Sequence, residues 1–293
     1  MSAIHVIAPG MQTTVQDLGR FGWAHYGVSA SGAADAFALR AGNLLVGNAE
    51  NAAALEMTLT GGTFEFEEDT VVALTGSDFG TGLMHWKPFE VKGGQKLSGG
   101  PLRSGARCYL CVRGGIAVPQ VMGSASVHTV TGVGGRPLRG GDMLPIGDAS
   151  VRRPRAGRNV PPPLATGTLR VTDGPQAGSF GDELYRGAYM VTEESNRMGL
   201  RLHGADVPAH AGHMLTEGVS LGAVQIPPDG QPIILFVEHQ TTGGYPKPAN
   251  VISADFRLLG QLRPRDQVAF ERIPIEQALR LLQQQEQWLY GLV

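Results

Sequence analysis

The sequence predicts a mainly β protein built as two β-rich lobes with a few short helices. The chain has 42 glycines and 19 prolines among 293 residues, and they stand between short apolar runs. Glycine supplies positive φ angles and proline a fixed φ, so this spacing is typical of many short strands joined by tight turns. Hydrophobic residues make up 42% of the chain, which is enough for a substantial core and excludes global disorder.

Charge and hydropathy exclude several classes of function. The chain has 24 basic and 26 acidic residues, a net charge of −2, whereas a nucleic-acid-binding protein needs a basic surplus. No run approaches the 18 apolar residues that a transmembrane helix requires, and the N-terminus lacks the features of a signal peptide. Two cysteines cannot form a disulfide framework. We therefore expect a cytoplasmic protein with no nucleic-acid or membrane partner.

The first lobe is predicted to cover residues 1–150. A strand at 4–8 precedes two polar loops, at 13–20 and 27–35, and the second loop leads into a helix. Ser31 is the expected N-cap of that helix, and Asp35 lies in the first turn, where the helix dipole favours an anion. Gly47 is the expected C-terminal stop. Strands and turns follow, with buried strands at 70–75 and 107–113.

A linker is predicted at 151–167, where arginines and three consecutive prolines replace any apolar periodicity. The second lobe, 168–293, opens with a strand at 169–172 and a short helix at 181–190. Further strands are expected near 200 and 224 and at 232–238 and 267–271. A terminal helix follows Pro274, with an apolar face formed by Ile275, Ala278, Leu279, Leu282 and Leu289.

The two lobes share a short sequence echo. L-R-G-G-D at 138–142 resembles L-R-P-R-D at 262–266, and a predicted strand follows each of them. Two similar barrels in tandem would give this pattern.

Most common chemical signatures are absent. The chain has no P-loop, no dinucleotide-binding G-x-G-x-x-G, no G-x-S-x-G elbow and no methionine-flanked lysine for biotin attachment. Cys108 and Cys111 lack a second cysteine pair for zinc, and positions i and i+3 of a strand point to opposite faces, so both are expected to be buried thiols.

A second group of possible metal ligands lies near residue 210. His203, Asp206, His210 and His213 are interpreted as a solvated turn rather than a metal site. No metal is expected.

Two glycine-containing polar segments are candidates for ligand binding. The first joins 16–20 to 29–35, and the second is 240–247. Glycines allow backbone N–H groups to approach a ligand closely. In the second segment Lys247 adds a cation and Tyr245 an amphipathic wall. A set of turn-rich connectors with structural ion pairs explains the same residues equally well.

The same segments resemble one protein family. In order, the motifs are T-T-V-Q-D-L-G-R, G-V-x-x-S-G-A-x-D, A-x-x-L-L-V-G-N, R-M-G-x-R-L, E-G-V-x-x-G-A-V-Q-x-P-P-D-G-Q-P-I-I-L and Q-T-T-G-G-Y-P-K. They resemble the family of 5-oxoprolinase C subunits, also called allophanate hydrolase subunit 2 or biotin-dependent carboxyltransferase-like proteins, over about 4–272. The Kip-type antagonists and part of urea carboxylase belong to the same family.

This resemblance implies cyclophilin-like β-barrels and a complex with partner subunits B and A. The implied reaction opens 5-oxo-L-proline to L-glutamate with ATP. Two alternatives stay open: a carboxyltransferase component that acts on urea or a similar amide with biotin carried by another chain, and a non-catalytic binding module of the Kip type. The chain departs from the family at Glu238-His239, where Asp-Arg is common, and its stretch 121–135 is short and lacks the usual Ser-Thr-Tyr near Ser126.

The implied chemistry suggests roles for individual residues. A lactam is a poor electrophile, and phosphorylation of its amide oxygen by ATP creates a leaving group, which requires cations, hydrogen-bond donors and a carboxylate. The predicted catalytic residues are Lys247, Glu217 and Asp17. The predicted substrate- or nucleotide-binding residues are Arg20, Ser31, Asp35, Asn196, Arg197, Gln240, Thr242 and Tyr245. We expect both polar segments to face one cavity in a cleft shared with the B subunit.

Overall fold

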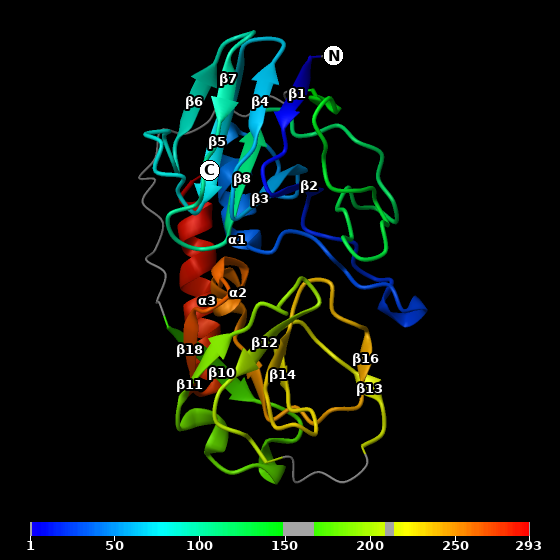
Figure 1. Cartoon of the computed structure of the whole chain (residues 1–293), viewed down its shortest axis with the longest axis vertical. Coiled ribbons are helices and arrows are strands. Elements are labelled where there is room, and N and C mark those ends of the chain that lie inside the picture. Colours follow the sequence, from blue (N-terminus) through cyan, green and yellow to red (C-terminus); the bar gives the residue numbers. More distant parts are fainter. Residues whose placement is uncertain (1, 149–166, 209–213, 293) are drawn as a thin grey trace. The chain divides into compact units, whose positions relative to one another are not determined.

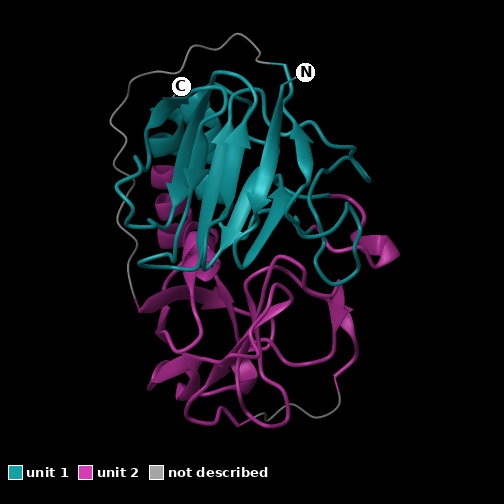
Figure 2. Cartoon of the chain, turned by 45° about the horizontal axis from the view of Figure 1, so that its top comes forward, with its two compact units in different colours: residues 1–20, 31–162, 286–293 teal, residues 21–30, 163–285 magenta. Residues whose placement is uncertain are grey.

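The computed structural model describes residues 2–148, 167–208 and 214–292 (Figure 1). As predicted, the protein is mainly β, with three α-helices among the described residues. The chain divides into two units (Figure 2). Unit 1 comprises residues 1–20, 31–162 and 286–293, and unit 2 comprises 21–30 and 163–285, so each unit combines segments that are distant in sequence. The predicted linker, apart from Gly167, lies outside the described residues.

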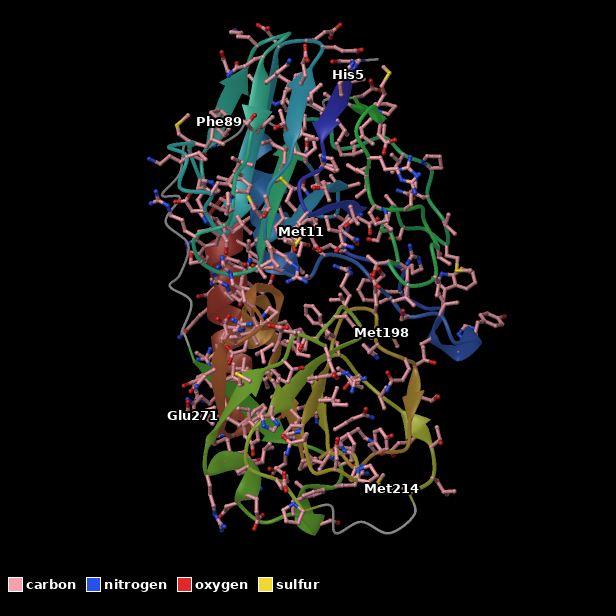
Figure 3. All side chains as sticks on the ribbon, viewed as in Figure 1. His5, Met11, Phe89, Met198, Met214 and Glu271 are labelled. Atoms are coloured by element: carbon pink, nitrogen blue, oxygen red, sulfur yellow. The ribbon has the colours of Figure 1, made fainter. Side chains whose placement is uncertain are left out.

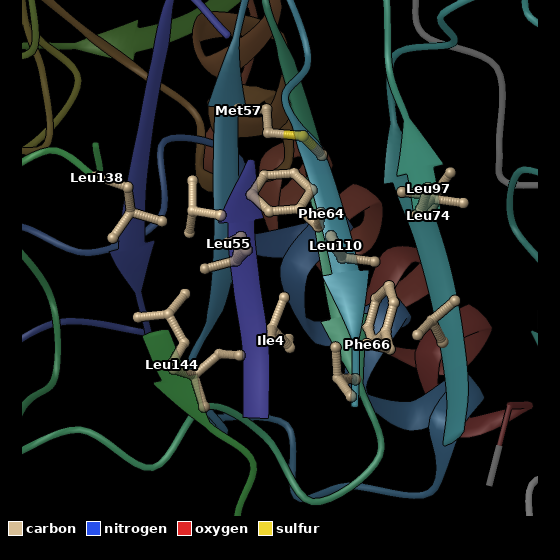
Figure 4. Close-up of a cluster of buried hydrophobic side chains, with 14 of the residues drawn as sticks. Ile4, Leu55, Met57, Phe64, Phe66, Leu74, Leu97, Leu110, Leu138 and Leu144 are labelled. Atoms are coloured by element: carbon tan, nitrogen blue, oxygen red, sulfur yellow. The ribbon is translucent and has the colours of Figure 1, made fainter. Parts of the chain in front are cut away.

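In its described residues, unit 1 contains two antiparallel sheets, helix α1 and the C-terminal end of helix α3. The sheet orders are β7-β4-β1-β9 and β2-β3-β8-β5-β6. The elements are β1 (Ala3–Ala8), β2 (Gln12–Gln16), α1 (Ala36–Val46), β3 (Ala54–Thr58), β4 (Thr63–Phe66), β5 (Thr70–Gly76), β6 (Pro88–Val91), β7 (Lys96–Ser98), β8 (Arg107–Val112) and β9 (Met143–Pro145). Buried side chains from both sheets form one core, in which Ile4 and Phe66 of the first sheet cluster with Leu110 of the second (Figure 4).

Helix α1 covers the other face of the five-stranded sheet. On β8, Cys108 and Leu110 belong to the core between the sheets, whereas Tyr109 and Cys111 belong to the cluster that includes α1. The two cysteines are free, buried and on opposite faces of the strand, as the sequence predicts. Helix and sheet approach closely at Gly42, where a Cβ would lie 2.6 Å from Cys111 Sγ. Glycine is therefore the residue that fits this position.

The N-cap of α1 is Asp35 and not Ser31. The Asp35 carboxylate accepts a hydrogen bond from Ala38 N at 2.9 Å, which is the standard N-cap contact. Ser31 instead has a left-handed φ of 56°, within a loop that precedes the helix by one turn. At the other end the prediction is confirmed, because Gly47 adopts a left-handed φ of 83°.

Unit 2 is built on a closed barrel with the strand order β10-β17-β14-β15-β12-β11-β18, and β13 and β16 form a separate pair. Its strands are β10 (Thr168–Asp173), β11 (Ala188–Val191), β12 (Gly199–His203), β13 (Glu217–Gly218), β14 (Ala223–Gln225), β15 (Ile233–Leu235), β16 (Thr242–Gly243), β17 (Ala249–Val251) and β18 (Gln267–Arg272). Its helices are η1 (Ala24–Tyr26), η2 (Ala177–Ser179), η3 (Glu183–Tyr185), η4 (Ser253–Asp255), α2 (Phe256–Gln261) and α3 (Ile275–Tyr290). None of the described helices is long and apolar enough to cross a membrane.

The helix predicted at 181–190 is wrong. Only the turn η3 is helical there, and residues 188–191 form barrel strand β11. In this strand Tyr189 and Val191 are buried and alternate with exposed neighbours, so the burial has the period of a strand. The barrel therefore determines the local structure of this segment.

The terminal helix is confirmed, but its predicted apolar face is only partly correct. Ala278 and Leu289 are buried, whereas Ile275 and Leu279 are 54% and 53% exposed. Ala278 packs with Ile252 and other residues of unit 2, and Leu289 packs within the α1 cluster of unit 1. Different parts of α3 thus pack in different clusters, and its buried residues do not form a single apolar stripe.

The sequence echo corresponds to the same turn in both units. Asp142 N donates to Arg139 O at 3.2 Å, and Asp266 N donates to Arg263 O at 3.1 Å. In both turns the aspartate carboxylate also accepts from the backbone N–H of that arginine, at 2.8 Å. The third residue has a positive φ in each case, 89° at Gly141 and 76° at Arg265, which is typical of a type II turn. The echo therefore records a shared turn before a strand.

Candidate functional site

The predicted site residues divide between the two units. Asp17, Arg20, Ser31 and Asp35 belong to unit 1, and the other seven belong to unit 2. Their convergence on one cavity is a relation between the units and stays a prediction. The geometry within each unit distinguishes residues that hold loops together from residues that face solvent.

Asp17 joins two distant loops of unit 1. Its Oδ1 accepts hydrogen bonds from Gly19 N at 2.8 Å, Ser124 Oγ at 2.6 Å and Ser126 Oγ at 2.5 Å. Its Oδ2 accepts from Ala125 N at 2.7 Å, and the residue is only 6% exposed. These four hydrogen bonds fix residues 124–126 against the end of β2.

Arg20 lies beneath the same loops. It is 1% exposed, and its Nη2 donates to the Ser126 carbonyl. The glycine at 134 makes this approach possible, because a Cβ there would lie 2.9 Å from Arg20 Nη2. Ser31 Oγ donates to the Val127 carbonyl at 3.2 Å, so it too contacts this region.

Asp35 caps α1 and also takes part in a buried polar chain. Asp35 N donates to the Tyr109 hydroxyl oxygen at 2.7 Å, and that hydroxyl donates to Glu56 Oε2 at 2.7 Å. Burial, together with the nearby Glu56 and Asp35 carboxylates, raises the pKa of Tyr109 well above its usual value. The tyrosine therefore stays protonated and is a permanent hydrogen-bond donor. The four predicted residues of unit 1 thus have well-defined structural contacts.

Lys247 and Glu217 form an ion pair in unit 2. Lys247 Nζ lies 2.6 Å from Glu217 Oε1, and Nζ also donates to the Tyr245 carbonyl at 3.2 Å. The lysine side chain is 3% exposed and the glutamate side chain 42% exposed, so the pair has one buried and one open end. Pairing of β13 with β16 places Glu217 opposite Gly243. The segment 240–247, here called the lysine loop, is thereby held close to Glu217.

Gln176 is a third member of this cluster that the sequence reasoning missed. Its Nε2 donates to Glu217 Oε1 at 3.0 Å, and its Oε1 accepts from Lys247 N at 2.9 Å. The hydrogen bonds from Lys247 and Gln176 lower the pKa of Glu217, which is therefore ionised at neutral pH. The sequence signal near Gln176 is the Gly174-Pro175 turn that follows β10. In the structure a Cβ at Gly174 would lie 2.2 Å from the Lys247 carbonyl oxygen, so the glycine allows the two segments to approach closely.

Arg197 forms a buried ion pair with Glu238. Arg197 Nε and Glu238 Oε1 are 2.5 Å apart, and the two side chains are 6% and 0% exposed. Asn196 is exposed and forms a side-chain turn, in which its Oδ1 accepts from the backbone N of Met198 (labelled in Figure 3) at 2.8 Å. His239, the departure from the family pattern, donates from Nδ1 to the Gln240 carbonyl at 2.6 Å, and burial lowers its pKa.

Gln240 and Thr242 are both exposed. The side chain of Gln240 contacts a buried neighbour, because its Nε2 donates to Gln225 Oε1 at 3.4 Å. Gln225 is 2% exposed, and its Nε2 has no hydrogen-bond partner among the described residues. A Cβ at position 243 would lie 2.7 Å from this Nε2, so the glycine leaves room for the amide. Gln225 is a second polar residue that the sequence reasoning did not select.

A cavity of about 620 Å³ lies in unit 2. Its lining includes Tyr245 of the Q-T-T-G-G-Y-P-K segment, Arg201 of R-M-G-x-R-L and Asp229 of the P-P-D-G-Q-P segment. Three separate motifs thus meet at one cavity, although only Tyr245 was predicted as a site residue. A smaller cavity of about 360 Å³ in unit 1 is lined by residues such as Lys92 and Arg113, and it contains none of the predicted site residues.

The possible metal cluster is only partly described. His210 and His213 lie outside the described residues, and Asp206 accepts a hydrogen bond from Gln231 Nε2 at its Oδ1. Within the described ranges, no group of three or more His, Cys, Asp or Glu residues has the geometry to hold a metal ion.

The closed barrel, the paired sheets and the loop motifs define a mainly β protein of the carboxyltransferase type. Residues 26–272 match the family described as the carboxyltransferase domain, subdomain A and B, and the chain belongs to this family. It is 40% identical to the 5-oxoprolinase C subunit of Escherichia coli (strain K12) over 303 residues, an alignment that covers 99% of this chain and 97% of the relative. The two chains therefore match over nearly their full lengths.

Two solved structures share the fold. The structure of TTHA0988 has a TM-score of 0.83 and 37% identity, and the match covers 92% of this chain but 55% of that one. The urea amidolyase of K. lactis has a TM-score of 0.88 and 31% identity, and the match covers 98% of this chain and 20% of that one. In both structures the matched region is part of a longer polypeptide.

Proposed function

We propose that this chain is the C subunit of an ATP-dependent 5-oxoprolinase, which converts 5-oxo-L-proline to L-glutamate together with partner subunits B and A in the cytoplasm. The observation that carries the proposal is the end-to-end match, at 40% identity, to the C subunit of the Escherichia coli 5-oxoprolinase. The corresponding 5-oxoprolinase C subunit of Haemophilus influenzae matches 98% of this chain at 36% identity. Lys247 and Glu217 lie within two of the family motifs, and together with Gln176 they form a chemically suitable site.

The cluster can manage charge and protons during opening of the lactam. The reaction adds water across the C–N bond, so one proton leaves the attacking water and one reaches the ring nitrogen. Glu217 is ionised and 42% exposed, and we assign it the role of proton acceptor. Lys247 is the cation that stabilises negative charge on the former amide oxygen. Gln176 is a positioning residue that holds both groups.

The remaining predicted residues take supporting roles in the proposal. Gln240, Thr242 and Tyr245 belong to the lysine loop and are proposed to contact substrate. Asp17 and Asp35, whose oxygens accept hydrogen bonds inside unit 1, are proposed to position loops rather than transfer protons. This revises the catalytic role that the sequence suggested for Asp17.

The cations of the described site do not fit a polyphosphate. Lys247 is paired with Glu217 and Arg197 with Glu238, so each positive charge is offset by a carboxylate. Arg20 is 1% exposed and donates to a backbone carbonyl. The proposal therefore assigns ATP binding to a partner subunit, and we derive no phosphoryl-transfer step on this chain.

An exposed aromatic segment supports the presence of a partner subunit. In residues 21–27, Phe21 and Tyr26 are 73% and 71% exposed. The segment is held in shape by hydrogen bonds from Tyr26 N to Trp23 O at 3.0 Å and from Gly27 N to Ala24 O at 2.9 Å. Ordered aromatic side chains are characteristic of protein–protein hot spots. The matched TTHA0988 chain is longer than the region that aligns with this chain. We propose that a partner subunit binds to the exposed aromatic segment.

Reconstitution with the partner subunits tests the function. We expect glutamate to form from 5-oxoproline only when ATP and all subunits are present. Lys247→Met should reduce turnover by about a hundredfold or more, the usual loss on removing an electrostatic group of this kind. Lys96→Met, which alters a lysine of unit 1 that is 57% exposed, is the matched control and should retain activity. Wild-type turnover by the Lys247→Met complex would show that the site assignment is wrong.

A second function is favoured by the structural match to the K. lactis urea amidolyase and by the name of the family. This function is carboxyl transfer from biotin, carried by another chain, to urea or a similar amide. The reconstituted complex distinguishes the two functions, because only the second requires a biotin carrier and consumes urea. A complex that forms tightly and turns over neither substrate would instead support a regulatory module of the Kip type.

A further inference from the structure

The cavity in unit 2 lies against an outward-facing strand of the barrel. Along β12, Leu200 and Leu202 are buried, while Arg201 and His203 are exposed, so the two polar side chains share the outer face. Strand pairing places Ile233 of β15 beside Arg201, and Thr192 N donates to the Arg201 carbonyl on the opposite side. Arg201, His203, Ile233 and Thr192 all line the cavity. The wall is thus built from paired barrel strands.

Arg201 is available for a ligand. Among the described residues, no ion pair or side-chain hydrogen bond holds its guanidinium group, whereas Arg197 of the same motif is paired with Glu238. A planar guanidinium presents two parallel N–H donors, which match the two oxygens of a carboxylate.

The other charges of the cavity restrict the kind of anion that fits. Glu194 and Asp229 line the same cavity and add two negative charges. Polyanions such as phosphates would be repelled by these carboxylates, whereas a single carboxylate can be met by Arg201 alone. Pro228, Pro232 and Ile233 provide apolar walls for the body of the ligand. The volume of about 620 Å³ is within the range of small-molecule sites.

We infer that this cavity is a monocarboxylate-binding site in which Arg201 anchors the carboxylate of a small lactam or amino acid. Tyr245 connects the cavity to the catalytic proposal, because this residue lines the cavity and its carbonyl accepts from Lys247 Nζ at 3.2 Å. The choice of ligand rests on the proposed function, and for that function the carboxylate is the one that 5-oxoproline carries. Arg201 is thus a specificity residue, distinct from the lysine cluster.

The experiment is a ligand-observed NMR titration of the full chain without partners. The probes are 5-oxoproline, 2-pyrrolidinone, which is the same ring without the carboxylate, and inorganic phosphate. The variants are Arg201→Gln and, as a matched control, Arg280→Gln on the exposed surface of α3 outside the cavity. Thermal unfolding of each variant verifies that it is folded. Because Arg201 is exposed, neither substitution should alter the melting temperature.

We expect 5-oxoproline to bind at least tenfold more tightly than 2-pyrrolidinone or phosphate. Arg201→Gln should weaken 5-oxoproline binding by about tenfold to a hundredfold, the range for one charge-assisted contact, and leave 2-pyrrolidinone unchanged. Arg280→Gln should bind like the wild type. The inference is overturned if 5-oxoproline does not bind, if phosphate binds more tightly, or if Arg201→Gln has no effect on 5-oxoproline.

This test is separate from that of the proposed function. If the chain binds 5-oxoproline through Arg201 but the reconstituted complex has no oxoprolinase activity, the binding site stands and the proposed function fails. If the complex is active but the chain shows no carboxylate preference, the proposed function stands and this inference fails.

Discussion

The buried ion pair between Arg197 and Glu238 gives the sharpest stability prediction. Both side chains are almost fully buried, at 6% and 0% exposure, with Nε and Oε1 2.5 Å apart. Glu238→Gln removes the negative charge and leaves the guanidinium buried without its counter-ion. Breaking a buried pair from one side typically costs about 3–5 kcal/mol, so we expect the free energy of unfolding to fall by about that amount.

The double variant Arg197→Met/Glu238→Met tests the reason for this loss. It removes both charges and keeps apolar volume at both positions. Replacing a buried pair by packed apolar residues is often neutral, so the double variant should be more stable than Glu238→Gln by roughly 2 kcal/mol or more. Glu193→Gln, which removes the exposed partner of Arg265, is the control and should change little, because its ion pair is 70–80% exposed.

The assay is urea unfolding of the full chain, followed by far-UV circular dichroism. The same proteins report on function, because a structural pair changes stability and leaves ligand affinity intact in the folded protein. If Glu238→Gln is as stable as the wild type, or if the double variant is less stable than Glu238→Gln, the account of this pair as a structural element is refuted.

Two further predictions follow from the packing of unit 1. Gly42→Ala should destabilise the protein by roughly 1 kcal/mol, because overpacking outweighs the gain in helix propensity. Its Cβ would lie 2.6 Å from Cys111 Sγ and 2.8 Å from Thr75 Oγ1. Calorimetry measures this loss, and Gly42→Ala/Cys111→Ala should recover part of it; a more stable Gly42→Ala would contradict the packing. His85 gives a pH dependence, because burial lowers its pKa, with the nearby Asp78 opposing this shift. As the pH falls through about 6.5, His85 therefore takes up a proton more readily in the unfolded chain than in the folded chain. The contribution of His85 to the free energy of unfolding accordingly decreases as the pH drops. His85→Gln should flatten this slope in melting curves from pH 7 to 5, and an unchanged slope would show that another group is responsible.

The sequence predicted those features that depend on local chemistry. Gly47 ends α1 because glycine adopts a left-handed φ without strain, and Cys108 and Cys111 lie on opposite faces because a strand alternates. The terminal helix and buried strands such as β5 and β8 follow from apolar patterns of the same kind. At the start of α1 the predicted N-cap, Ser31, is wrong, because the Asp35 carboxylate accepts the capping hydrogen bond and the Asp35 N–H is held by the buried hydroxyl of Tyr109.

Features that depend on distant contacts could not be predicted. The role of Asp17 is determined by Ser124 and Ser126, more than 100 residues further along the chain. Gln176 lies 71 residues before Lys247, and nothing in its own neighbourhood marks it except a Gly-Pro turn. The strand at 188–191 was predicted as a helix because only closure of the barrel determines its partners, β12 and β18. Burial and pairing therefore decide which motif residues remain open to a ligand.

Arg201 illustrates the same limit at the site. The R-M-G-x-R-L motif contains two arginines, and its local pattern does not distinguish a buried arginine from an open one. Strand alternation and pairing separate them, because Arg197 is buried against Glu238 and Arg201 faces the cavity. The sequence analysis selected Arg197, which is buried, as a binding residue, whereas the geometry favours Arg201, which is exposed.

The most direct test of the function is an assay of this chain reconstituted with the proposed partner subunits A and B. Glutamate and phosphate release are measured with 5-oxoproline or urea as the substrate, in the presence and absence of ATP. The account predicts that both products form from 5-oxoproline with ATP, and that omitting this chain abolishes glutamate formation. Full activity without this chain, or carboxylation of urea in place of lactam opening, would contradict it.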